Sequence, residues 1–116
     1  MNDNELLSGT NWVKKYYDIC GRWAIEKQAD KKILVFEDDF KTLRGPDVKV
    51  FLSQKHIEEI DKRESVDLEG LFLGEIANFS GAQSFEIPED VSLDDFESLV
   101  LHCKAFSVVW GGTNLR

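Results

Sequence analysis

Long hydrophobic runs and an excess of positive charge are both missing from this 116-residue sequence. Its 14 basic residues are outnumbered by 22 acidic ones, so the formal net charge is −8. A negative mean field repels phosphate backbones and anionic lipid headgroups, which argues against nucleic acid as a partner. The longest apolar stretches, residues 71–73 and 106–110, are far shorter than the roughly 20 residues of a membrane helix, which argues against membrane insertion.

The first fifteen residues lack the apolar segment of a secretory signal peptide and include two acidic side chains. We therefore expect a cytoplasmic protein. A periplasmic or secreted location is the alternative if the sequence begins at a trimmed start.

Cysteine and histidine are scarce. Cys20 and Cys103 permit one disulfide, but not the dense framework of small secreted domains. His102 and Cys103 are adjacent, and successive side chains on a strand leave opposite faces of a sheet, so they do not suit one metal ion. Nothing around His56 or His102 resembles a haem pocket, and no serine sits in a nucleophile elbow. We expect no metal, no cofactor and no enzymatic activity.

Acidic side chains gather near the start of the C-terminal third. Calcium binding requires six or more converging oxygen ligands, and the spacing here matches no EF-hand loop. We therefore interpret this acidic segment as a solvated turn. Its acidic residues are Glu86, Glu89, Asp90, Asp94, Asp95 and Glu97.

The first twenty residues have a helical spacing of apolar side chains. Apolar residues recur at intervals of three and four, the period of one face of a helix, and they are Trp12, Val13, Tyr16, Tyr17 and Cys20. This pattern predicts a short helical leader over residues 1–20.

From residue 21 the apolar period falls toward two, which is typical of strands. We predict a hairpin from residues 23–26 and 33–36, a strand from residues 48–52 after the turn at Gly45 and Pro46, and a second hairpin from residues 71–76 and 83–87. Two further strands follow, at 99–103 and 106–110. Short strands with a turn about every ten residues predict an antiparallel β-sandwich or a partly closed barrel of about 6–8 strands, formed by residues 21–116 as one domain.

Three segments give the sequence a family resemblance. They are GRWAIEK at 21–27, FEDDFKTLRGPDVKVFLS at 36–53, and FSGAQSFEIPEDVSLDDFESLVLHCKAFSVVWGGTNLR at 79–116. In order and wording they resemble the DM13 domain, a small all-β module. The resemblance implies a redox or electron-transfer accessory in which one cysteine, Cys103 here, is the working atom and a larger oxidoreductase is the partner.

Cys103 has other interpretations. It follows Leu99 and Leu101 on one face of a strand, where a cysteine packs as a small apolar side chain and is unreactive. It could instead form a thiolate stabilised by Lys104, or a disulfide with Cys20 if their Cα atoms come within about 7 Å. If Cys103 is only a core residue, the alternative function is a protein-binding or ligand-binding module that uses residues 54–69 and exposed aromatic side chains such as Tyr17 and Trp110.

Overall fold

The computed structural model describes residues 4–116, apart from the side chains of 67 and 68. Within them the chain forms eleven strands and three very short helices. The strands are β1 (Glu5–Gly9), β2 (Val13–Lys14), β3 (Ile19–Cys20), β4 (Trp23–Gln28), β5 (Lys31–Phe36), β6 (Lys41–Thr42), β7 (Val48–Ser53), β8 (Leu71–Glu75), β9 (Gln83–Ile87), β10 (Ser98–Cys103) and β11 (Val108–Asn114). The helices are η1 (Ile57–Glu59), α1 (Val66–Glu69) and η2 (Leu93–Asp95).

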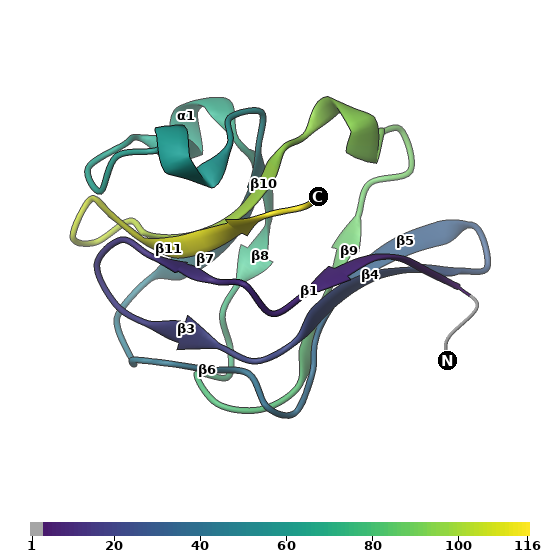
Figure 1. Ribbon diagram of the computed structural model, residues 1–116, viewed down its shortest axis with the longest axis horizontal. Coiled ribbons are helices and arrows are strands. Elements are labelled where there is room, and N and C mark those ends of the chain that lie inside the picture. Colours follow the sequence, from purple (N-terminus) through teal and green to yellow (C-terminus); the bar gives the residue numbers. More distant parts are fainter. Residues whose placement is uncertain (1–3) are drawn as a thin grey trace.

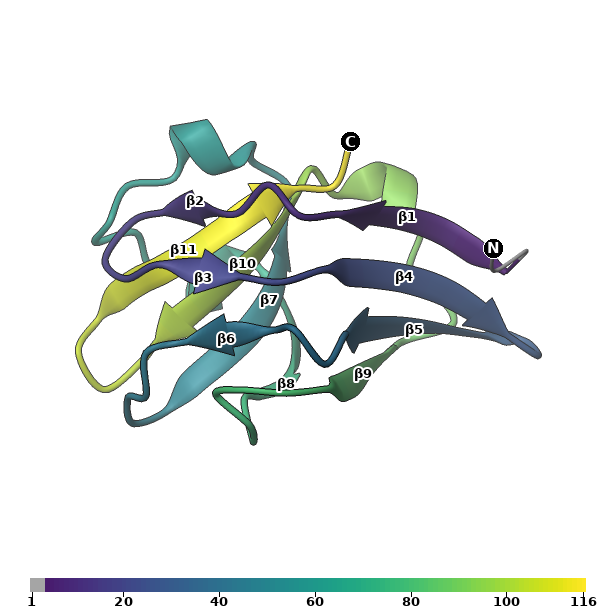
Figure 2. The ribbon, with the colours of Figure 1, turned by 60° about the horizontal axis from the view of Figure 1, so that its bottom comes forward.

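The strands form three antiparallel sheets, ordered β1-β4-β5-β9, β2-β11-β10-β7-β8 and β3-β6. Figure 2 shows β3 continuing the line of β4, and β6 continuing that of β5, so the smallest sheet extends the first one. The two larger sheets share one apolar core. The all-β prediction is confirmed, and a sandwich describes the arrangement because the described strands do not close into a barrel.

The five-stranded sheet is covered on both faces. Val48, Val50 and Leu52 of β7 point into the main core between the sheets. Phe51 points the other way, into a smaller cluster with Ile57 and other residues of the 57–66 segment. Figure 1 shows this helical segment over the sheet, on the side away from β3 and β6. β10 is accordingly buried along its whole length, with an apolar run from Leu99 to Leu101 at its centre.

The predicted helical leader is wrong. Residues 4–20 instead form β1, β2 and β3, which pair with β4, β11 and β6. The aromatic side chains that recur every three or four residues do pack on the core. The backbone that carries them is not helical, because three successive amides point to one carbonyl oxygen. The amides of Lys15, Tyr16 and Tyr17 lie 3.4, 3.1 and 3.1 Å from the carbonyl oxygen of Trp110.

Two other strand predictions need correction. The first hairpin, β4–β5, is confirmed, but the segments predicted as a second hairpin do not pair with each other. β8 pairs with β7 and β9 with β5, in different sheets. The last strand also runs through Gly111 and Gly112 instead of ending there. A side chain at Gly112 would meet the carbonyl oxygen of Leu99 at 2.5 Å, so glycine permits this close pairing.

Candidate functional site

Cys103 is the last residue of β10 and points into the main core. It shares that face with Leu99 and Leu101, as the alternation of the sequence predicts, and its exposed fraction is 0%. Its Sγ donates a hydrogen bond to the carbonyl oxygen of Pro46, 3.0 Å away. The sulfur is therefore a buried thiol with its proton engaged by the backbone. A cysteine acts as a nucleophile when it is a thiolate and accessible to its reaction partner. Cys103 in this arrangement is neither.

The loop that contacts the sulfur through Pro46 is short and largely exposed. Residues 43–47 connect β6 to β7, and Leu43, Arg44 and Pro46 are exposed. This loop meets the turn at 104–107, where the amide of Lys104 donates to the carbonyl of Asp47 at 3.1 Å. The side chain of Lys104 is exposed, whereas Cys103 is buried. The thiol thus lies at the end of a strand, beneath a loop, and not in the middle of the sandwich.

An aromatic cluster lies beside the loop. Trp110 is buried, with 1% of its surface exposed, so the expectation that it is an exposed docking residue is wrong. Its indole nitrogen donates to the carbonyl of Leu43 at 3.3 Å. The ring of Tyr17 lies 4.6 Å from the Trp110 ring between centroids. A Cβ atom at Gly45 would come within 2.6 Å of the indole, so glycine lets the loop lie close to Trp110.

The two cysteines do not form a disulfide. Both are free thiols, and Cys20 is the exposed one. Cys20 lies opposite Lys41 in the β3–β6 pair. It lines a cavity of about 300 Å³ together with Tyr17 and Leu43. Cys20 is therefore the thiol that solvent reaches in the folded protein, and Cys103 is not.

The two histidines lie apart from Cys103. His102 is buried on the opposite face of β10, with its ring 6.1 Å from that of Phe51 between centroids. His56 is on the loop before η1, and its Nε2 lies 3.4 Å from a carboxylate oxygen of Glu97. In the part of the chain that the structure describes, no group of three His, Cys, Asp or Glu side chains is arranged to hold a metal ion.

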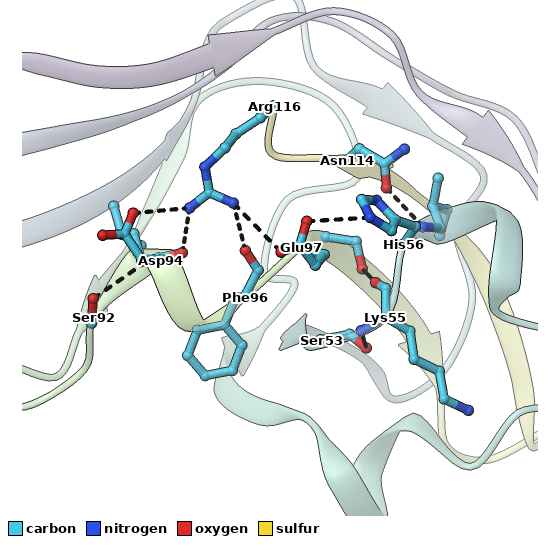
Figure 3. A network of polar contacts seen from close by, with 12 residues as sticks. Ser53, Lys55, His56, Ser92, Asp94, Phe96, Glu97, Asn114 and Arg116 are labelled. Atoms are coloured by element: carbon cyan, nitrogen blue, oxygen red, sulfur yellow. Dashed lines mark hydrogen bonds and ion pairs between the residues drawn. The ribbon is translucent and has the colours of Figure 1, made fainter.

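The acidic corner is held by the C-terminal residue. Figure 3 shows the Arg116 guanidinium between η2 and Glu97. It donates to the carbonyl oxygens of Leu93 at 2.6 Å and Phe96 at 2.9 Å, and it lies 3.5 Å from a carboxylate oxygen of Asp94. These contacts, and the Ser92 side chain that accepts from the Asp94 amide, give the corner a structural role. Sequence reasoning did not identify Arg116 or the Pro46 carbonyl, because both act through partners distant along the chain.

Ion pairs tie the first sheet together at the surface. Arg22 contacts the carboxylates of Glu5 and Glu37. Hydrogen bonds from these two carboxylates raise the pKa of Arg22, and the bond to Arg22 lowers the pKa of Glu5. These contacts join β1, the start of β4 and the segment after β5, and they lie on a different sheet from Cys103.

The comparisons with known proteins identify one family. A family model described as Electron transfer DM13 matches residues 12–115, nearly the whole chain. No curated protein and no solved structure matches the sequence. None of the helices formed by the described residues is long and apolar enough to cross a bilayer.

Proposed function

We propose, since this chain belongs to the DM13 electron-transfer family, that it is a non-enzymatic redox accessory whose working sulfur is Cys103. In this proposal the Cys103 thiol is buried and unreactive in the closed protein, and it becomes accessible to solvent when the loop at 43–47 opens. The observation that carries the proposal is the position of Cys103. It is completely buried, but at a strand end and under exposed backbone.

The loop is suited to open locally. Proteins open in parts with free energies from near zero up to that of global unfolding, and segments with few buried contacts open first. Three of its five residues are exposed. The contacts that hold it include hydrogen bonds of Pro46 with Cys103, of Asp47 with Lys104 and of Leu43 with Trp110, the Lys49–Asp47 ion pair, and the packing of Gly45 on Trp110. None of these contacts belongs to the strand pairing of β7 with β10 or of β10 with β11.

The chemistry that fits a single gated thiol is exchange with a disulfide of a larger oxidoreductase. Once uncovered, Cys103 gives its proton to solvent, and the thiolate attacks one sulfur of the partner's disulfide. A mixed disulfide forms, the partner's sulfur–sulfur bond breaks, and the released partner thiolate takes up a proton. Cys103 is oxidised and the partner's leaving sulfur is reduced, so electrons and protons balance without a metal or flavin on this chain.

A second function is favoured by the same burial. If the loop never opens below global unfolding, Cys103 is a packing residue and the chain is a protein-binding or ligand-binding sandwich. An exposed fraction of 0% and a satisfied S–H donor are what this alternative requires.

Thiol labelling in water separates the two functions. The background is Cys20→Ser, so that Cys103 is the only thiol, and Cys103→Ser is the reciprocal control. Pro46→Gly loosens the loop by widening the conformational freedom of its backbone, an effect of about 0.4–1 kcal/mol. We expect it to speed the labelling of Cys103 roughly two- to fivefold. Pro88→Gly, at the only other proline of the chain, is the matched control. It should change the labelling rate of Cys103 no more than its effect on the free energy of global unfolding accounts for. Equal acceleration by both substitutions would favour the packing function.

A further inference from the structure

A cavity of about 290 Å³ lies at the opposite end of the β10–β11 pair from the Cys103 loop. Its walls come from residues 8–13, from the chain end at 113–116, and from Trp23 and Glu58. Figures 1 and 2 both show the C-terminal end lying beside β1, so segments from the two ends of the sequence meet here. Its volume is close to the lower limit of small-molecule sites.

Trp23 contributes an unused hydrogen-bond donor to this cavity. The chain has three tryptophans. Trp12 donates its indole N–H to the carbonyl of Gly21 at 2.9 Å, and Trp110 donates to Leu43. Trp23 is 1% exposed, and its indole nitrogen is buried with no acceptor among the described residues. A buried donor without a partner is costly, because it has given up its hydrogen bonds to water.

Gly9 explains which way the donor faces. Gly9 pairs with Trp23 across the β1–β4 ladder. A Cβ atom at Gly9 would lie 3.0 Å from the indole nitrogen, nearer than to any other atom. Both residues line the cavity, so the nitrogen edge of the indole lies beside the space left by the missing side chain. β1 is an edge strand, and its end can move aside to admit a ligand atom without breaking a second strand pairing.

Three other polar side chains of the cavity are already engaged. The Thr113 hydroxyl donates to the carbonyl of Asn11 at 2.9 Å. The Asn114 side chain accepts from the amide of Ile57 at 2.8 Å and donates to Glu58 at 2.7 Å. The bond from Asn114 lowers the pKa of Glu58, so Glu58 is an anion on the wall, opposite the cation Arg116. One charge of each sign, on a protein of net charge −8, gives no preference for an anionic ligand.

We propose that this cavity binds a small neutral organic molecule through a carbonyl or amide oxygen, which accepts the hydrogen bond of the Trp23 indole N–H. The site is separate from Cys103 and does not depend on the redox function. Recognition is by one buried donor beside the apolar part of the wall, which Val13, Leu115 and the Trp23 ring supply.

The test is an NMR titration of the full chain labelled with nitrogen-15 at tryptophan. The probes are N-methylacetamide and 2-pyrrolidone, with acetate as the anionic comparison. We expect the Trp23 indole signal to move downfield and to saturate with either neutral probe, while the Trp12 and Trp110 signals, already bonded to carbonyls, move little. Trp23→Phe assigns the signal. It should also weaken binding about tenfold, followed on the backbone amide of Thr113, because an aromatic ring is kept and the N–H donor is lost.

Gly9→Ala supplies the matched control, because its methyl group fills the space over the nitrogen. Saturable binding that disappears in Gly9→Ala but remains in Gly81→Ala supports the site, because Gly81 lies outside this cavity and an alanine there adds only the backbone strain of its positive φ. If Gly9→Ala does not fold, the Trp23→Phe titration decides alone. A linear shift without saturation, equal shifts of all three indole signals, or binding of acetate in preference to the neutral probes would overturn the proposal.

Discussion

Replacing Cys103 with serine tests the burial of this sulfur. The substitution puts a more polar group at a position with an exposed fraction of 0%, among Leu99, Leu101 and the valines of β7. An unsatisfied buried hydroxyl costs about 1–3 kcal/mol. Here the Pro46 carbonyl, which accepts the S–H at 3.0 Å, can also accept the hydroxyl proton. We therefore expect a loss of about 1–2 kcal/mol in the free energy of unfolding.

The matched control is Cys20→Ser, which makes the same chemical change at an exposed position. Surface substitutions usually stay within about 0.5 kcal/mol. Thermal unfolding followed by circular dichroism should give a melting temperature roughly 4–8 °C lower for Cys103→Ser, and close to that of the parent protein for Cys20→Ser. Equal melting temperatures for the two variants would refute the burial of Cys103 and the loop that depends on it.

Three further substitutions or conditions have defined outcomes. Gly112→Ala should lower the free energy of unfolding by about 2–4 kcal/mol in chemical denaturation, since its Cβ would lie 2.5 Å from a backbone oxygen of β10; a loss below 0.5 kcal/mol would contradict the pairing of β10 with β11. Acid should destabilise the fold, because hydrogen bonds lower the pKa values of Glu5, Asp47 and Glu58 in the folded chain below their ordinary values of 4.5 and 3.8. Their contribution is complete above pH 4.5 and is lost as the pH falls through the folded-state values. Glu58→Gln should flatten that acid slope in a pH series of unfolding curves, and an unchanged slope would argue against the Glu58–Asn114 bond. Arg116→Gln should increase hydrogen exchange at the amides of the η2 turn, because Arg116 donates to the carbonyls of Leu93 and Phe96; unaltered exchange there would argue against this role.

The alternation of apolar and polar residues correctly predicted which side chains of a strand share a face. The alternation of Val48, Val50 and Leu52 placed β7 correctly because each face of this strand contacts a different core. The same reasoning placed Cys103 on the leucine face of β10. Both predictions depend only on the period of two along a strand, which the sequence displays directly.

Long-range partners account for the errors. The spacing of Trp12, Tyr16 and Tyr17 imitates a helix, but the acceptor for that segment's amides is the carbonyl of Trp110, far along the chain. Strand partners likewise follow the packing of the two sheets, so β8 and β9 pair with β7 and β5 and not with each other. Trp110 was expected to be exposed because its cover comes from the separate segments that hold Tyr17 and Gly45.

The contact of the 43–47 loop with Cys103 could not be predicted from the sequence either. The order of residues shows a turn at Gly45 and Pro46, but it does not show that the Pro46 carbonyl lies on the thiol of residue 103, 57 positions away. The same holds for the cavity at Trp23, whose walls join the two ends of the chain.

The denaturant dependence of Cys103 labelling, measured in Cys20→Ser, tests the central claim most directly. Opening that exposes only the loop at 43–47 uncovers little surface, so the labelling rate should be nearly independent of denaturant at low concentration and should join the global unfolding line only near the midpoint. A labelling rate that follows the full slope of global unfolding from the lowest concentration would contradict a gated thiol. It would leave Cys103 as a packing residue of the core.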